Sequence, residues 1–210
     1  MVLIGPGSLD EDTRGLILNF CEGFNSEIAL VGATTRNIAE ALNIGLKLVK
    51  TEFTIRFDSD DLMMRGRIEE QVDYLNKNSD VIVVGGQVIL ISKSGRHILW
   101  PRVKYPTPKE VLREKMKEGC FLAHPAVAMR TDVILSLGGY REWFDSAEDY
   151  DLWLRVLEIG EIANLNRKVI KYRQHNGQAS RKIGDVNKFT QAARNASSRR
   201  LMNIKPDLEI

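Results

Sequence analysis

Residues 53–67 read FTIRFDSDDLMMRGR and carry the clearest structural signal of the chain. The stretch begins with β-branched and aromatic residues, continues with the carboxylates Asp58, Asp60 and Asp61, and becomes amphipathic from about Arg65. This order predicts a strand, an acidic turn and a helix. Ligands of open α/β sheets bind at the carboxyl ends of strands, and carboxylate oxygens suit Mg²⁺ or Mn²⁺. A simpler interpretation is that Asp60 or Asp61 only caps the helix.

Strands and helices alternate on both sides of this stretch. The patterns predict strands at residues 1–4, 28–31, 53–57, 81–91, 97–100, 126–129 and 169–172. They predict helices up to residue 24, capped by Ser8 or Asp10, and at residues 38–50, 65–78, 107–117, 131–137, 148–159 and from about 185. Gly85 and Gly86 indicate a bulge or a close backbone approach within the long strand. This alternation predicts a mixed sheet covered by helices.

Composition excludes several classes of protein. The 210 residues are 43% hydrophobic and 28% charged, and they contain no linker-like segment, which is typical of one globular domain. A formal charge of +2 does not indicate nucleic acid as a partner. Cys21 and Cys120 have no pairing or metal-like spacing, so we expect free thiols in the cytoplasm. The longest apolar run, residues 81–91, is too short for a transmembrane segment, so any membrane association would be peripheral.

Six segments, taken together, resemble a family 2 glycosyltransferase of the GT-A fold. They are RFDSDD at residues 56–61, Arg65 with Arg67, HPAV at 124–127, GGY at 138–140, AEDYDLWLR at 147–155 and YRQH at 172–175. Each is weak alone, but their order and spacing are specific. The resemblance covers most of the chain and implies a Rossmann-like, mainly parallel mixed sheet flanked by helices. It also implies a nucleotide-sugar and metal half at residues 1–100, an acceptor and catalytic half at 101–180, and a C-terminal helix and tail at 181–210.

The resemblance implies a metal-dependent, inverting transfer from a nucleotide sugar, most simply a UDP-sugar such as UDP-glucose, to a hydroxyl acceptor that the sequence does not identify. Mn²⁺ or Mg²⁺ would be held by Asp60, Asp58 and His175, where the cation stabilises the charge that the leaving diphosphate gathers. The matching donor residues are Arg36, Asn43, Arg56, Asp58, Ser59, Asp60, Arg65, Gly138 and Gly139. For Arg65, an ion pair with Glu69 or Glu70 is the alternative, and Gly138-Gly139 also reads as a helix stop.

Asp149 matches the general base that would take the proton of the acceptor hydroxyl. Glu148 and Asp151 are the other candidates, and favourable placement of acids at a helix N-terminus is the alternative for all three. His124 and Trp153 match positions at the sugar or acceptor pocket. For these two, a buried structural histidine and a core tryptophan are the alternatives.

The chain departs from the family at its N-terminus. It begins at what resembles the second strand of the family, so one wall of the uridine pocket is absent, and Gly5-Pro6-Gly7 replaces an acidic residue. The edge left open invites pairing with another chain, so we expect a homo-oligomer through this edge. A second hypothesis follows: a degenerate member that binds nucleotide or carbohydrate without transfer. A third, a nucleic-acid binder acting through Arg199 and Arg200, lacks an aromatic platform.

Overall fold

The computed structural model describes residues 2–6, 10–22, 29–33, 37–100, 103–144, 146–175 and 183–202. Its strands are β1 (Val2–Pro6), β2 (Ala29–Ala33), β3 (Phe53–Ile55), β4 (Leu62–Met63), β5 (Val81–Ser92), β6 (Ala128–Arg130) and β7 (Glu161–Gln174). Its helices are α1 (Glu11–Glu22), α2 (Ile38–Leu48), α3 (Arg67–Lys77), α4 (Lys109–Lys115), α5 (Thr131–Ser136), α6 (Glu148–Val156) and α7 (Ile183–Leu201), with a 3₁₀ turn at His124–Ala126.

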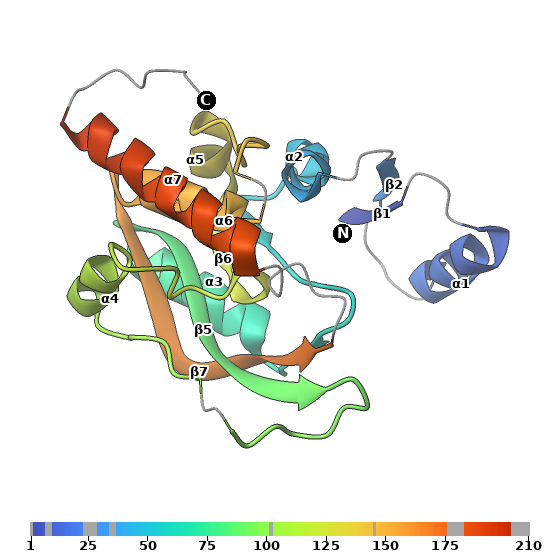
Figure 1. Ribbon diagram of the computed structural model, residues 1–210. Coiled ribbons are helices and arrows are strands. Elements are labelled where there is room, and N and C mark those ends of the chain that lie inside the picture. Colours follow the sequence, from blue (N-terminus) through green and yellow to red (C-terminus); the bar gives the residue numbers. More distant parts are fainter. Residues whose placement is uncertain are drawn as a thin grey trace.

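The main sheet has five strands in the order β3-β6-β5-β7-β4. Its longest pairing joins β5 and β7 in parallel, and these two strands curve together across the molecule (Figure 1). The short pairings of β3 with β6, β6 with β5 and β4 with β7 are antiparallel. The sheet is therefore mixed, as predicted, and parallel along its longest part.

Helices cover both faces of this sheet. On one face α6 and α7 cross β5 and β7 (Figure 1), and Trp153 of α6 lies at 0% exposure in the largest apolar cluster with Ile162 of β7. On the other face Leu75 of α3 packs with Val84 and Ala128. Burying apolar side chains on both faces is the main source of stability for such a layered fold.

The glycine pair of β5 is confirmed as a close approach with an irregular register. A Cβ on Gly85 would lie 2.6 Å from Leu122, and one on Gly86 would lie 2.7 Å from Val169. The pairing of β5 with β7 shifts between Gly86 and Gln87. A larger side chain at Gly85 or Gly86 would clash with Leu122 or Val169, so both positions favour glycine.

A buried arginine fixes the carboxyl end of β3 to α3. Arg67, 1% exposed, donates from Nη2 to the carbonyl oxygens of Arg56 at 2.8 Å and Val127 at 3.2 Å, and from Nε to Gln71 at 2.9 Å. Gln71 in turn donates to the carbonyl oxygens of Val84 and Ala126. Burial lowers the pKa of Arg67 to about 10. These bonds hold the acidic turn that follows β3 against the ends of the neighbouring strands.

The N-terminal units differ from the predicted single sheet. In the described residues, β1 pairs in parallel with β2 alone, and β3 pairs with β6 alone, so two sheets replace one. Helix α2 contacts both β1 and β2, and in Figure 1 these strands and α1 lie beyond α2, to one side of the main sheet. The backbone edge of β3 that faces away from β6 has no strand beside it among the described residues. The homo-oligomer that we expect through the N-terminal edge stays a prediction.

Smaller differences concern the element bounds. Strand β4 was not predicted, β7 starts at Glu161 rather than at residue 169, and the partner predicted for β5 at residues 97–100 makes one bridge, between His97 and Ile91. Asp10 accepts from the backbone of Thr13 and so caps α1, whereas Ser8 lies outside the described residues. No described helix is both long enough and apolar enough to cross a membrane.

Candidate active site

The acidic turn does not act as a helix cap. Strand β4 separates it from α3, and the residue before α3 is Gly66, at a φ of 78° and without a side-chain capping bond. This excludes the simpler interpretation of Asp60 and Asp61. The carboxylates of the turn instead contact basic side chains and a distant strand end.

Two of these carboxylates have basic partners. Arg56 Nη1 lies 2.6 Å from Asp58 Oδ2, and His175 Nε2, just beyond β7, lies 3.0 Å from Asp60 Oδ2. Each of the four side chains is at least partly shielded from water. The structure thus brings together Asp60 and His175, two of the three predicted metal ligands, from positions 115 residues apart.

Asp61 is the buried member of the turn, with 4% exposure. Its Oδ1 accepts the backbone N–H of Arg173 at 2.7 Å, while Oδ2 has no hydrogen-bond partner among the described residues. Burial raises the pKa of Asp61 to about 6, and the charges of Asp58 and Asp60 act in the same direction. Arg173 itself donates from Nε to the carbonyl oxygen of Asp60 at 2.6 Å. It therefore fixes the backbone of the acidic turn to the end of β7.

The acids at the start of α6 have three different surroundings. Asp149 is half-buried, and its Oδ1 accepts the N–H of Tyr150 at 2.7 Å. Burial raises the pKa of Asp149, against the opposing effects of that hydrogen bond and of the Arg56 charge. Glu148 is 5% exposed, with Oε1 4.0 Å from His124 Nδ1. Of the three acids, Asp149 alone is not buried, and its raised pKa suits a proton acceptor.

The prediction that Asp151 is a candidate base does not fit its position. Its side chain has 0% exposure and lies 2.9 Å from Arg155 Nε and 3.6 Å from Arg141. Arg155 also donates to the carbonyl oxygens of Leu137 and Gly139. Asp151 therefore orients the arginine that holds the glycine turn, and a substrate hydroxyl cannot reach it.

His124 is buried at 8% exposure, and its Nε2 lies 2.9 Å from the hydroxyl of Tyr140. Burial and, to a smaller extent, the Arg56 charge lower the pKa of His124 well below its usual value, so the imidazole is neutral. Trp153, predicted at the pocket, is fully buried with its ring edge-on to His124 at 5.9 Å. The burial of Trp153 confirms the core interpretation, and its predicted position at the sugar or acceptor pocket is corrected.

The turn at Gly138 and Gly139 uses the left-handed backbone region, with φ of 81° and 68°. Asn43 of α2 holds it: Nδ2 donates to the carbonyl oxygen of Tyr140 at 2.7 Å, and Oδ1 accepts the N–H of Tyr140 at 2.8 Å. A Cβ on Gly139 would lie 2.4 Å from that Oδ1. Asn43 was predicted to bind the donor, but both polar atoms of its amide form hydrogen bonds to the turn. The helix-stop interpretation of Gly138-Gly139 is compatible with a role in donor binding.

The remaining predicted donor residues are less informative. Ser59 lies in the acidic turn, and Arg65 is exposed. The predicted alternative partner of Arg65, Glu70, is paired with Arg167. Arg36 lies outside the described residues. Among the residues that the structure describes, no three acidic, histidine or cysteine side chains converge as a ready-made metal site, because Asp58 turns to Arg56.

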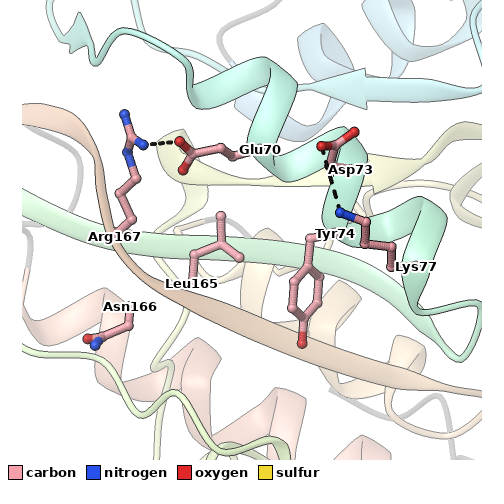
Figure 2. Close-up of a pocket in the computed structure, with 7 residues that line it drawn as sticks. All are labelled: Glu70, Asp73, Tyr74, Lys77, Leu165, Asn166 and Arg167. Atoms are coloured by element: carbon pink, nitrogen blue, oxygen red, sulfur yellow. Dashed lines mark hydrogen bonds and ion pairs between the residues drawn. The ribbon is translucent and has the colours of Figure 1, made fainter.

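A cavity of about 540 Å³ lies elsewhere, between α3 and β7 (Figure 2). Glu70 points to Arg167 and Asp73 to Lys77, so the charged side chains at its rim form ion pairs with one another. None of the predicted site residues lines this cavity. It is open and shallow, and it offers no convergent polar groups of the kind that mark a binding site.

Residues 2–137 match the family model described as "Glycosyl transferase family 2". The chain belongs to this family. Among curated relatives, an O-antigen biosynthesis glycosyltransferase of Escherichia coli, WbnJ, is 39% identical over 139 residues, which cover 65% of this chain and 53% of the relative. An uncharacterized glycosyltransferase of Haemophilus influenzae is 31% identical over 185 residues, covering 88% of this chain and 67% of the relative. The chain thus spans about half to two thirds of the length of these relatives.

Solved structures of glycosyltransferases share the fold. S. aureus TarS in complex with UDP-GlcNAc has a TM-score of 0.68 at 14% identity, with 98% of this chain and 58% of that chain covered. GalNAc-T7 with UDP, GalNAc and Mn²⁺ has a TM-score of 0.66 at 14% identity, with 90% of this chain and 41% of that chain covered. At this identity the likeness concerns the fold alone, and it confirms the predicted GT-A architecture. The predicted family 2 assignment is confirmed by the family model.

Three contributors to this family 2 site were not predicted. Arg173 and Tyr140 stood inside the quoted motifs without an assigned role, and Asp61 was considered only as a carboxylate of the acidic turn or a helix cap. Their importance comes from partners that are far away in the sequence, such as His124 for Tyr140 and Asp60 for Arg173. An arginine beside a histidine at a strand end was the one available signal for Arg173.

Proposed function

We propose that this chain is the donor-binding and catalytic part of a metal-dependent, inverting glycosyltransferase that uses a UDP-sugar. The observation that supports this most directly is the convergence of Asp60 and His175 at the carboxyl end of β3, beside the Arg56–Asp58 pair. Membership of family 2 gives the reaction class. Solved structures of the same fold that hold UDP or UDP-GlcNAc support a UDP-sugar, with UDP-glucose as one member of that class.

The residues at the acidic turn fit a divalent cation. Asp60 Oδ2 and His175 Nε2 lie close enough to ligate one ion together. Asp58, which is paired with Arg56, would act through the water shell of that ion or join it on leaving Arg56. A bound Mn²⁺ or Mg²⁺ would neutralise the diphosphate of the donor and stabilise the leaving group. Arg56 adds a fixed positive charge to the same place, and Arg173 holds the backbone of Asp60 in position.

Asp149 is the proposed general base. Its carboxylate is half-buried, the Arg56 charge acts on it, and its raised pKa strengthens it as a proton acceptor. Glu148 stays the second candidate, beside His124. The acceptor is a hydroxyl group whose carrier we leave open.

The alternative is a degenerate member that binds nucleotide or carbohydrate without transfer. The split between the β1-β2 sheet and the main sheet favours this alternative, because the nucleotide base would lack a wall at that edge. The intact acids Asp60 and Asp149 favour catalysis, since a binding module needs no base.

Replacing Asp149 with Asn distinguishes the two functions. We expect Asp149→Asn to bind UDP-sugar with Mn²⁺ as the wild type does and to lose about 10²–10⁴-fold in UDP release, measured by a coupled assay with water and a panel of glycosides as acceptors. Asp73→Asn, an exposed acid of α3, is the matched control. Equal UDP release by wild type and Asp149→Asn would remove Asp149 from the mechanism, and no release by the wild type would favour the degenerate alternative.

A further inference from the structure

A loop after β5 exposes large apolar side chains among basic ones. Leu99 and Trp100 are each 81% exposed, more than any other large apolar side chain of the described residues. Lys93, Arg96 and Lys104 are also exposed. We call residues 93–100, 103 and 104 the basic loop. Adjacent Leu and Trp side chains this open to water are unusual on a surface that binds nothing.

The basic loop has an ordered base. The backbone N–H of Ser92 donates to the carbonyl oxygen of Arg96 at 2.8 Å, and that of Ile98 donates to the carbonyl oxygen of Leu90 at 2.8 Å. Gly95 closes the turn at a φ of 84°. Ile98 packs onto the apolar cluster beneath, whereas the next two side chains face water. The exposure of Leu99 and Trp100 therefore follows a hairpin that is anchored to the sheet.

The charge of this region has one sign. Residues 81–109 contain five lysines and arginines and no acidic residue, within a chain whose net formal charge is +2. Within the part of the chain that the structure describes, Lys93, Arg96 and Lys104 form no salt bridge, while Lys109 is paired with Asp80. Unpaired cations beside exposed Trp and Leu suit a surface that is negatively charged and apolar just beneath.

The basic loop is bonded to the candidate donor site. Arg173 Nη1 donates to the carbonyl oxygens of Lys93 at 2.9 Å and Ser92 at 3.2 Å, while its Nε donates to that of Asp60. One arginine thus holds the base of the loop and the acidic turn together. Whatever surface the loop contacts lies at a fixed position relative to the donor site.

We propose that the basic loop docks on a bilayer that carries anionic lipids, with Trp100 and Leu99 in the headgroup region and Lys93, Arg96 and Lys104 on the lipid charges. The two apolar side chains of the loop, with cations around them, match the interfacial pattern of peripheral proteins. Docking would present the donor site to an acceptor at the membrane surface. The docking itself requires no donor, so it can be tested separately from the proposed transfer.

The test is co-sedimentation of the chain with phosphatidylcholine vesicles, with and without one quarter phosphatidylglycerol, at low and at moderate salt. We expect binding to the anionic vesicles only, weakened about tenfold or more by salt because the charges are exposed. A triple variant should bind the anionic vesicles about a hundredfold more weakly, since each basic residue contributes about fivefold. It combines Lys93→Gln, Arg96→Gln and Lys104→Gln. Leu99→Ser with Trp100→Ser should also lose binding.

Two matched variants serve as controls. Lys47→Gln with Lys77→Gln and Lys117→Gln removes the same charge from other exposed positions, and Trp143→Ser removes a tryptophan that is 60% exposed elsewhere. Both should bind anionic vesicles as the wild type does, and thermal unfolding should show that every variant is folded. Absence of wild-type binding, equal loss in the control triple variant, or undiminished binding of the Leu99 and Trp100 double variant would overturn the proposal. Pull-down of a protein through Trp100 without vesicle binding would overturn it in favour of a protein partner.

Discussion

At the scale of single residues, the site is built from carboxylates that have been given unequal environments. Asp58 is paired with an arginine, Asp60 with a histidine, and Asp61 is buried against a backbone N–H. Three acids within four positions repel one another unless neighbouring charges or protonation relieve them. Basic partners reduce the repulsion at Asp58 and Asp60, and the raised pKa of Asp61 reduces the charge of the third acid.

Asp61 should therefore make stability depend on pH. In the folded chain its pKa is about 6, above the usual 3.8, so the folded state binds more protons and the free energy of unfolding falls as pH rises through this range. Asp61→Asn keeps an oxygen for the N–H of Arg173 and removes the charge. We expect it to be about 2 kcal/mol more stable than the wild type at pH 8 and equal to it near pH 3.5.

Urea unfolding in EDTA at the two pH values measures this difference. EDTA is needed because a bound cation would favour the ionised turn. Asp73→Asn, an exposed acid on α3, is the control and should change stability by the same small amount at both values. A stability difference for Asp61→Asn that does not vary with pH would show that the pKa of Asp61 is the same in the folded and unfolded states.

At the scale of elements, the glycine turn after α5 joins three parts of the site. Asn43 binds it from α2, Arg155 binds it from α6, and Tyr140 leads from it to His124. The two glycines differ in their surroundings: a Cβ on Gly138 meets nothing within 4 Å, whereas one on Gly139 meets Asn43. Gly138 and Gly139 thus share a left-handed backbone and differ in their contacts, so substitutions at the two positions can be compared directly.

Gly139→Ala should destabilise the fold more than Gly138→Ala. Both place a Cβ in the left-handed region, which costs about 1 kcal/mol. Gly139→Ala must in addition displace the Asn43 amide and its hydrogen bonds, so we expect a total loss of about 3 kcal/mol. Thermal or urea unfolding compares the two variants. Equal losses would mean that Asn43 moves aside freely and does not hold the turn.

The sequence predicted the regular elements better than the contacts. The helix patterns located α2, α3, α6 and α7 to within a few residues, and α2 and α3 each bury one face. The first half of β7, Glu161–Lys168, was not predicted because Asn164, Asn166 and Arg167 interrupt the alternation of apolar and polar residues. Short β4 has no pattern to find.

The site residues were predicted from motifs. The motifs did not distinguish residues that could contact substrate from buried residues that hold those side chains in place. Asp151 and Trp153 stand beside Asp149 in the same motif, yet both are buried. Asn43 and Tyr140 are 97 positions apart and meet only in the fold. Burial and long-range pairing depend on how the layers pack, which local patterns do not encode.

At the scale of the whole molecule, this family 2 chain is proposed to bind a nucleotide sugar through a cation held by Asp60 and His175. Its sheet is split next to β3, so base binding is the step at greatest risk. The arginine that fixes the acidic turn also fixes the basic loop, which relates the donor site to the proposed membrane surface.

The most direct test is calorimetric titration of UDP-, GDP- and dTDP-sugars into the chain with Mn²⁺ and again with EDTA, for the wild type and for Asp60→Asn. The account predicts binding of a UDP-sugar that requires Mn²⁺ and is lost in Asp60→Asn, with Asp73→Asn unaffected. Binding that is equally strong in EDTA, or that survives Asp60→Asn, would contradict it.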